Sequence, residues 1–479
     1  MFENVLGQAA TAQIRQDAEA GLLAPSMLFW GPPAAGKGSA ALELARFLSC
    51  EQPPPGRGRW NCSCAACALH RHLSHPDLLV LGPRSFSPEI AAARDCLLRE
   101  KGGAAAPVLF SRALRKLGFR FSPVLWEDDS KLGKFAPLLS AIEEDTEELD
   151  RLLKDRKETG EAAGDFEKNL DRLSARMVQN AFKLEAEGMG ESIPIAQIRR
   201  AAAWSHLAPA GRGKFILIEN ADRMQEGARN SLLKILEEPS PALTIVLTTT
   251  RREAILPTLL SRLRPYRFMR RDAAAEEEVI RRIFRASSFP RTEKGENRVA
   301  AYLDSFLPVS PASFRPLAAF FIASLAKRAI VAARKKGLRD IPGALLRLGL
   351  RCGPAAAEGG LGLSTDSGEV VSTVLAGAEN FSPRSLFSRF MGIVLELVSE
   401  SIVKGEAAGS AVSPGTDGSY APSMIVYNDI WRTCAGEAAQ AVLVWNQSPA
   451  LTLDRLANVL VSSMAAAAVR EGAAQGVVP

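Results

Sequence analysis

The sequence predicts a parallel α/β domain followed by an all-α region, and three observations support this. Apolar runs typical of buried strands, at residues 26–30, 214–218 and 243–247, alternate with helical segments. Strands that alternate with helices favour a parallel sheet. After Arg271 this alternation stops, and Ala- and Leu-rich segments continue to the end. With 479 residues the chain also exceeds what one hydrophobic core usually supports, so we expect several domains.

Composition limits the class of protein. Apolar residues make up 47% and charged residues 23%, with a mean hydropathy of +0.00, which excludes a disordered chain and a membrane transporter. No uninterrupted apolar run reaches the ~18 to 20 residues of a membrane span, and residues 1–4 lack signal-peptide character. We therefore expect a cytoplasmic protein with no membrane partner. The net charge of +6 favours polyanionic partners only weakly, because it is spread over the whole length.

The first predicted strand leads into a loop that fits the phosphate-binding pattern G-x-x-x-x-G-K. Gly31 and Gly36 would let backbone N–H groups approach phosphate oxygens, and Lys37 would meet the outer phosphates. A Ser or Thr that binds Mg²⁺ normally follows the lysine, but here Gly38 follows, and then Ser39. The pattern predicts a degenerate site that holds ATP or ADP without turnover. The alternative is a tight turn with nothing bound.

The second predicted strand ends in an altered acidic motif. An active ATPase carries an aspartate for Mg²⁺ and a glutamate that orients the attacking water. Glu219 and Asn220 stand there instead. Asn220 cannot act as a base, and the carboxylate of Glu219 lies one methylene further from the backbone than that of an aspartate. Since Gly38 is altered as well, we expect no ATP hydrolysis by this chain's own site.

Four of the seven cysteines cluster between residues 50 and 67: Cys50, Cys62, Cys64 and Cys67. Cys64 and Cys67 have the C-x-x-C spacing of a zinc site, and a four-thiolate shell would make the zinc structural. The short spacing between Cys62 and Cys64 weakens Cys62 as the fourth ligand, which leaves His70 or His72 as alternatives.

Residues 84–191 interrupt the α/β pattern with a strongly charged segment. Its apolar residues recur at intervals of three and four, which places them on one helical face: Leu149, Leu152, Leu153, Phe166, Leu170, Leu173, Met177, Ala181 and Leu184. A Gly- and Ala-containing break at 159–164 divides the run. We expect a helical hairpin inserted peripherally into the domain, with a solvated hairpin that has no partner as the alternative. Residues 404–423, rich in Gly, Ser, Ala and Pro, predict a flexible loop.

Several of these motifs occur together in one known family. Its pattern is carried by residues 2–8, the phosphate loop, the cysteine cluster, residues 75–77 (His-Pro-Asp), residues 230–239 (NSLLKILEEP) and Ser261-Arg262. In this order they resemble the bacterial clamp-loader subunits of DNA polymerase III, most of all the delta-prime type. The resemblance covers residues 1–82 and 192–271, and residues 83–191 have no recognised counterpart in it.

The resemblance implies a domain organisation and a set of partners. It implies an AAA+ module at 1–271, a helical lid at 272–336 and a helical collar at 337–479. In that family five subunits form an open ring that places the sliding clamp on primed DNA. The expected partners are therefore gamma/tau-type and delta-type subunits, the clamp and primed DNA, in a hetero-oligomer.

The resemblance also implies roles for single residues. Arg262 would reach the ATP of a neighbouring subunit, and Thr249 would match the polar sensor of the γ-phosphate. Arg315 could match a lid sensor, although a solvated arginine is the favoured interpretation. The leading hypothesis is a non-hydrolysing structural subunit. The alternatives are a gamma/tau-type motor in which Ser39 and Glu219 take the magnesium roles, and an AAA+ remodeller of recombination intermediates, which residues 230–239 and the cysteines disfavour.

Overall fold

The protein is described from a computed structural model, which divides the chain into two compact units, Met1–Leu307 and Pro308–Pro479. The structure describes residues 1–53, 56–103, 105–127, 131–159, 163–289, 297–307, 311–343, 345, 346, 348–350, 352, 371, 383–403, 422–443 and 447–474.

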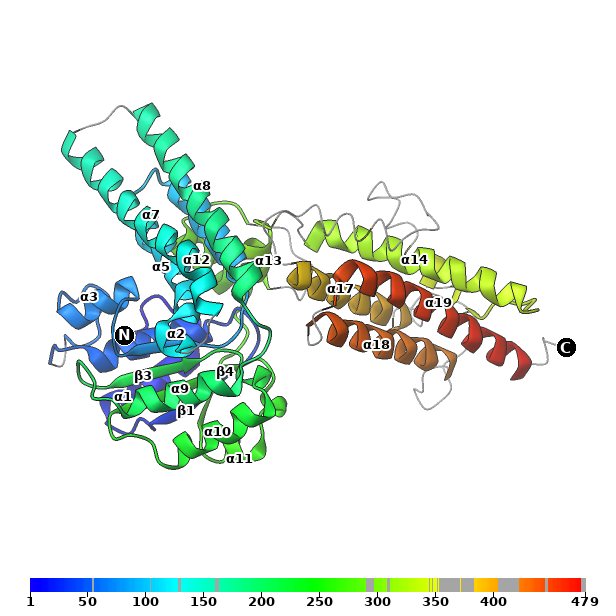
Figure 1. Cartoon of the computed structure of the whole chain (residues 1–479), viewed down its shortest axis with the longest axis horizontal. Coiled ribbons are helices and arrows are strands. Elements are labelled where there is room, and N and C mark those ends of the chain that lie inside the picture. Colours follow the sequence, from blue (N-terminus) through cyan, green and yellow to red (C-terminus); the bar gives the residue numbers. More distant parts are fainter. Residues whose placement is uncertain are drawn as a thin grey trace. The chain divides into compact units, whose positions relative to one another are not determined.

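The first unit is built on a parallel five-stranded sheet (Figure 1). Its strands are β1 (Ser26–Trp30), β2 (Leu78–Leu81), β3 (Lys214–Ile218), β4 (Leu243–Thr249) and β5 (Arg264–Arg267). Their order across the sheet is β2-β3-β4-β1-β5. Trp30 pairs with Thr249 on one side and Arg267 on the other, so the carboxyl ends of β1, β4 and β5 meet at one edge. The predicted α/β class is confirmed. The sequence interpretation did not name β2 or β5.

Helices cover both faces of this sheet. They are α1 (Ala9–Glu19), α2 (Lys37–Ser49), α3 (Ala65–His72), α4 (Ser87–Arg99), α5 (Ala106–Gly118), η1 (Phe119–Phe121), α6 (Pro123–Trp126), α7 (Lys131–Thr159), α8 (Ala163–Gly188), α9 (Ile195–His206), η2 (Ala221–Arg223), α10 (Glu226–Glu237), η3 (Arg252–Ala254), α11 (Pro257–Leu260), α12 (Ala273–Phe284) and α13 (Arg298–Asp304). Alternate strand residues face opposite cores. Phe29 packs in the core that contains α1 and α2 residues, whereas Leu28 packs with residues of α9 and α10.

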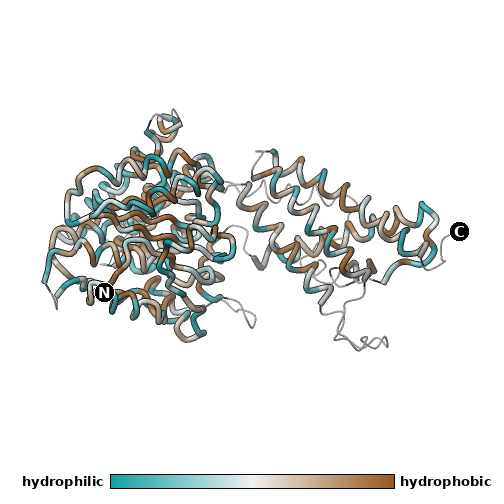
Figure 2. The backbone as a smooth tube through the Cα atoms, turned by 90° about the horizontal axis from the view of Figure 1, so that it is seen from below, coloured by the Kyte–Doolittle hydropathy of each residue, from teal (hydrophilic) through white to brown (hydrophobic). Residues whose placement is uncertain are grey.

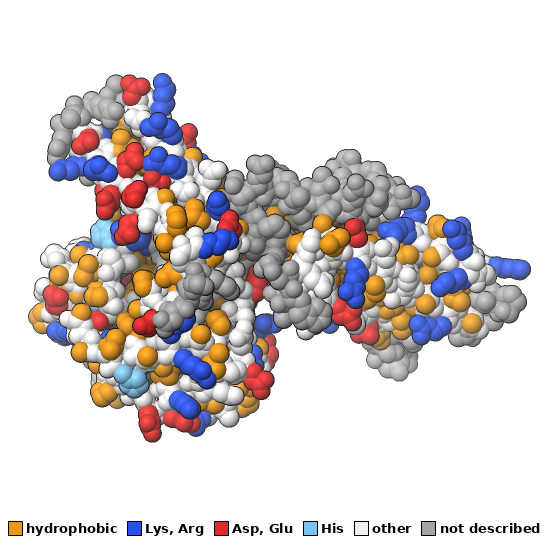
Figure 3. Space-filling view, viewed as in Figure 1, with side chains coloured by type: hydrophobic (Ala, Val, Ile, Leu, Met, Phe, Trp, Pro, Cys, Tyr) orange, Lys and Arg blue, Asp and Glu red, His pale blue; other side chains and the backbone are white. Residues whose placement is uncertain are grey.

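The predicted helical hairpin is present as α7 and α8, which lie side by side in Figure 1. Its predicted apolar face is the buried one, with Leu149, Phe166 and Met177 fully buried. Charged side chains crowd its outer surface (Figure 3). The break at 160–162 lies outside the described residues.

The prediction that the whole of residues 84–191 is peripheral is wrong. Leu125 packs in the apolar core on one face of the sheet. The guanidinium of Arg120 donates to the Gly82 carbonyl at 2.8 Å and pairs with Glu219, which follows β3. Single residues of this kind have no periodicity, so no pattern in the sequence marks the base of the segment as part of the domain.

The described part of the second unit contains four long helices: α14 (Pro311–Lys335), α17 (Pro383–Val403), α18 (Pro422–Leu443) and α19 (Pro449–Ala474). Apolar stretches recur along each helix (Figure 2), and the apolar side chains form one core around Trp431. The all-α prediction is confirmed for these residues. The predicted loop at 404–423 lies outside the described residues, except that Pro422 and Ser423 begin α18.

The compact units do not divide at the predicted boundary between lid and collar, residue 336. α12 and α13 pack against α4 in the first unit, whereas α14 belongs to the second unit. The lid and collar assignment stays a prediction. One stretch of the described chain, Phe314–Lys335 in α14, is long and apolar enough to cross a membrane, but 67% of its apolar 18-residue window is buried, as in a core helix. Counting uninterrupted apolar runs missed this stretch.

Candidate nucleotide and metal sites

The phosphate loop needs its glycines for steric reasons. Gly31 has φ +148°, and a Cβ there would lie 2.1 Å from the carbonyl oxygen of Phe268. Gly36 has φ +89°, and a Cβ there would lie 2.7 Å from Nη2 of Arg271. Both glycines therefore serve the packing of the loop against the segment that follows β5, whether or not a phosphate is bound.

Lys37 is engaged within the loop. Its Nζ donates hydrogen bonds to the carbonyl oxygens of Gly31, at 2.8 Å, and Pro32, at 2.6 Å. The residue is only 7% exposed, and burial lowers the pKa of this lysine to about 8. Two of the three N–H groups of the Lys37 ammonium thus bind carbonyl oxygens of its own loop. In this sense the loop is closed on itself.

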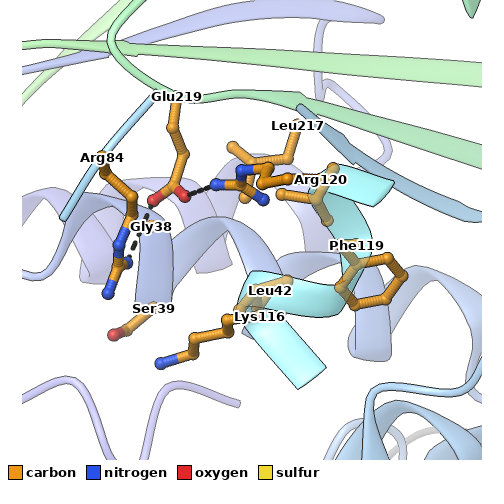
Figure 4. Close-up of a pocket in the computed structure, with 10 residues that line it drawn as sticks. Gly38, Ser39, Leu42, Arg84, Lys116, Phe119, Arg120, Leu217 and Glu219 are labelled. Atoms are coloured by element: carbon orange, nitrogen blue, oxygen red, sulfur yellow. Dashed lines mark hydrogen bonds and ion pairs between the residues drawn. The ribbon is translucent and has the colours of Figure 1, made fainter. Parts of the chain in front are cut away.

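Glu219 follows β3 and is surrounded by arginines (Figure 4). Its Oε1 lies 3.4 Å from Nη1 of Arg84, and its Oε2 pairs with Arg120. Burial would raise the pKa of the Glu219 carboxyl, but these two guanidinium groups outweigh it and hold the pKa below its ordinary value. The carboxylate is therefore charged and already neutralised by the chain's own cations.

The Glu219 carboxylate also explains why the residue after Lys37 carries no hydroxyl. A Cβ on Gly38 would lie 2.5 Å from Oε1 of Glu219. A serine or threonine at position 38 would collide with Glu219 as the two arginines hold it. Ser39 cannot replace that hydroxyl in this conformation, because Figure 4 shows its side chain pointing away from the Glu219 carboxylate.

Asn220 and Thr249 both have structural partners. Asn220 adopts the left-handed conformation, at φ 51°, that asparagine tolerates well, and its Nδ2 donates to the Pro83 carbonyl at 2.7 Å. The hydroxyl of Thr249 donates to Oδ1 of Asp222 at 2.7 Å, and Arg251 pairs with the same carboxylate. Thr249 is fully buried. The hydroxyl predicted to sense a γ-phosphate is thus used within the chain.

The four predicted cysteine ligands come together. Their Sγ atoms all lie within 4.8 Å of one another, and all four residues are buried. The Sγ atoms of Cys50 and Cys62 are 3.8 Å apart, which equals the sulfur–sulfur edge of about 3.8 Å in a tetrahedron with Zn–S bonds of about 2.3 Å. His70 instead pairs with the Ser49 hydroxyl at 2.9 Å, and His72 is exposed. The cluster fits a metal such as zinc with Cys62 as the fourth ligand.

A buried arginine accompanies this cluster. Nη1 of Arg46, in α2, lies 3.7 Å from Sγ of Cys67 and also donates to the Arg59 carbonyl at 2.6 Å. Its Nη2 pairs with Glu43 at 2.7 Å. A tetrathiolate zinc centre would carry a net charge of about −2, so a cation beside one sulfur is favourable. The cysteines are therefore tied to the same helix that begins at the phosphate loop.

Arg262 lies apart from the phosphate loop, just after α11. Its Nη2 pairs with Oε1 of Glu237 at 2.7 Å, and its Nη1 donates to the Thr258 carbonyl at 2.9 Å. The side chains of Arg262 and Glu237 are 35% and 49% exposed. Arg315 belongs to the second unit and pairs with Glu400 at 2.9 Å, so it is engaged in an ion pair rather than simply solvated.

Sequence reasoning missed the cations that close the site. Arg84, Lys116 and Arg120 line the small cavity beside Gly38, and Arg271 donates to the Ala34 carbonyl within the phosphate loop at 2.6 Å. Each is a single basic residue, and the contacts of Arg84 and Arg120 with Glu219 join positions far apart in the chain. No spacing or motif marks such a residue.

Comparisons with known proteins agree with this architecture. A family model described as "DNA polymerase III, delta subunit" matches residues 7–100 and 142–272. DNA polymerase III subunit delta' of Pseudomonas aeruginosa is 35% identical over 91 residues, which are 19% of this chain and 28% of that protein. A DNA polymerase III gamma subunit-related protein of Thermotoga maritima aligns over 57% of this chain and 81% of its own at 17% identity, with a TM-score of only 0.23.

The first unit is thus similar to clamp-loader subunits of DNA polymerase III. The family match and the Pseudomonas aeruginosa relative both support a clamp-loader family for this unit. The expectation that residues 83–191 have no counterpart there is corrected, because the family match includes 83–100 and 142–191. Between its two matched stretches the family model leaves out residues 101–141, which contain α5, η1, α6 and the start of α7.

Proposed function

We propose that this protein is a non-hydrolysing, delta-prime-type subunit of a DNA polymerase III clamp loader. The observation that carries the proposal is the pairing of Glu219 with Arg84 and Arg120. Phosphoryl transfer needs a metal ion and an oriented nucleophile. In this chain the acidic residue is neutralised by arginines, position 38 has no hydroxyl and Asn220 stands where a base would. The chain would be a non-catalytic subunit of the polymerase assembly.

The second part of the proposal is that Arg262 acts on the ATP of a neighbouring subunit. Its ion pair with Glu237 is half-exposed, and such pairs stabilise a protein by about 1 kcal/mol or less. A γ-phosphate carries more charge than one carboxylate, so Arg262 could leave Glu237 for it at small cost. Arginines that act in this way raise rates by about 10³ to 10⁵.

A gamma/tau-type motor is the competing function. It would require Ser39 and Glu219 to bind magnesium. The ion pairs of Glu219 and the direction of the Ser39 side chain argue against that role. An AAA+ remodeller of recombination intermediates is less well supported, because the family match points to polymerase III subunits.

The proposal includes a structural zinc and a set of partners. Four thiolates leave no open coordination position, so the metal would stabilise the fold and would not activate water. The proposed partners are gamma/tau-type and delta-type subunits, the sliding clamp and primed DNA, all in the cytoplasm. Nucleotide could remain at the loop without turnover only if Lys37 exchanged its two carbonyl partners for phosphate oxygens.

The test assembles the full chain with motor and delta-type subunits, the clamp and primed DNA. Arg262→Ala is expected to lower DNA-stimulated ATP turnover and clamp loading roughly tenfold or more, because one active site loses its arginine. Arg281→Ala is the matched control, since Arg281 has a similar exposed pair with Glu278 at 2.9 Å. Unchanged rates for Arg262→Ala in a fully formed complex would contradict the role of Arg262. ATP turnover near 1 s⁻¹ by the isolated chain would contradict the non-hydrolysing assignment.

A further inference from the structure

The segment that contains α5 and η1 lies outside the family match, yet it reaches the centre of the altered ATPase site. Lys116, Phe119 and Arg120 of this segment line the small cavity beside Gly38 and Glu219 (Figure 4). We call residues 101–141 the additional segment. The family match covers the strands, the phosphate loop and α2 but not this segment, so the contacts of the segment with Glu219 lie outside what the match describes.

Arg120 is held at the carboxylate from several sides. The residue is 4% exposed, its Nε donates to the Gly82 carbonyl at 2.8 Å, and Nη2 pairs with Glu219. Its guanidinium lies 5.0 Å from the ring centre of Phe86. Burial lowers the pKa of Arg120 to about 10, so the group still carries its charge at neutral pH. Arg120 is therefore a fixed, buried cation at the position of the acidic motif.

The surrounding charges form one closed network. Arg84 bridges Glu219 and Glu89, and Lys116 also pairs with Glu89. Three cations thus face two carboxylates, which leaves one net positive charge. A divalent cation added to this cluster would be repelled by the net charge and would have to displace an arginine.

The space is also too small for a metal. The cavity lined by Gly38, Ser39, Arg120 and Glu219 has a volume of about 10 Å³. About 10 to 15 Å³ is needed for one water molecule, and protein-bound Mg²⁺ usually keeps several waters. The magnesium ion that an active P-loop ATPase would bind therefore does not fit these residues.

We propose that the additional segment closes the magnesium position from within the chain, with the Arg120 guanidinium as a permanent replacement for the metal cation. This inference deepens the proposed non-hydrolysing function and rests on it. Two separate causes of inactivity follow. The altered motif residues lack groups that catalysis needs, and Arg120 fills the place where the metal would be.

Restoring the altered motif residues alone would not restore a metal site at Glu219. Gly38→Ser with Asn220→Glu would return the missing hydroxyl and base, but Arg120 would still occupy the carboxylate. The doubly restored chain should remain without metal binding at Glu219 until Arg120 is also replaced.

The experiment uses the full chain and Mn²⁺ as the probe, with thermal unfolding and electron paramagnetic resonance as readouts. Arg120→Ala leaves a buried carboxylate with one weaker partner, and should raise the unfolding equilibrium constant on the order of 100-fold. Millimolar Mn²⁺ should raise the unfolding midpoint of Arg120→Ala. It should not raise that of the wild type or of Arg120→Ala combined with Glu219→Gln.

Arg120→Lys keeps a cation at this place and guards against a failure of the alanine variant to fold. It should bind no Mn²⁺ at Glu219. Arg115→Ala is the control: Arg115 lies in α5, just before η1, and is bonded to the His72 carbonyl, so the variant should behave as the wild type toward Mn²⁺. The proposal is overturned if the wild type or Arg120→Lys binds Mn²⁺ in a manner lost with Glu219→Gln, or if Arg120→Ala unfolds like the wild type. Because none of these readouts involves ATP or partner subunits, they can fail while the proposed function stands.

Discussion

Charged side chains at the phosphate-loop edge are buried, whereas those around Arg262, in the same domain, are partly exposed. At the loop, Lys37 and Arg120 are 7% and 4% exposed, and each is bonded to atoms of its own chain. Near α11, Arg262 is 35% exposed and pairs with Glu237, which is 49% exposed. Buried charges are costly to separate from their partners, whereas exposed ones are not.

This difference indicates which region can still act on another molecule. A buried, paired cation stabilises the domain, but it cannot leave its partner to bind a ligand without a large loss of stability. An exposed arginine with one partner can exchange that partner on assembly. The comparison therefore supports the proposal that the nucleotide site of this chain is structural and that Arg262 acts on a neighbouring subunit.

The largest expected effect on stability comes from removing the metal. It tests whether the cysteine cluster keeps the phosphate-loop edge rigid. α2 begins at Lys37 and ends just before Cys50, so the cysteine cluster anchors the far end of the helix that carries the loop. Zinc should copurify at one ion per chain. Cys67→Ser should remove it and destabilise the first unit by several kcal/mol, below the ~10 kcal/mol seen for zinc in small peptides.

Metal analysis and thermal unfolding are the measurements for this prediction. Cys434→Ala, at a buried cysteine of the second unit, should keep the zinc. Absence of zinc from protein prepared without chelator would contradict the site.

The next largest expected effect on stability is that of a side chain at Gly38, in the altered phosphate loop. Gly38→Ala should destabilise the protein by roughly 1 to 3 kcal/mol, because the new Cβ would meet the Glu219 carboxylate that two arginines hold in place. Gly392→Ala in α17, where no atom lies within 4 Å of the new Cβ, should instead stabilise by up to about 1 kcal/mol. Chemical denaturation measures both. Equal effects of the two substitutions would show that Glu219 moves freely.

The sequence predicted those parts of the molecule that have a period or a motif. Spacings of three and four gave the buried face of the hairpin, and the cysteine cluster gave a metal-like site. β2 and β5 were missed because each has only four residues, too few for a clear pattern. The pairing of Glu219 with Arg84 and Arg120 joins residues far apart in the chain, so only the folded structure brings them together.

The smallest expected effect on stability is that of replacing Arg262 in the isolated chain. Arg262→Ala removes one half-exposed ion pair and one hydrogen bond to the Thr258 carbonyl, so the loss of stability should be about 1 kcal/mol or less. Glu237→Gln should cost a similarly small amount, and the double variant should show a coupling energy below about 1 kcal/mol in chemical denaturation. A loss above about 2 kcal/mol for Arg262→Ala alone would mean that this arginine is a structural residue like Arg120. A small loss would mean that any large effect of Arg262→Ala in an assembled complex arises at the neighbouring subunit, because the fold of its own chain would be almost unchanged.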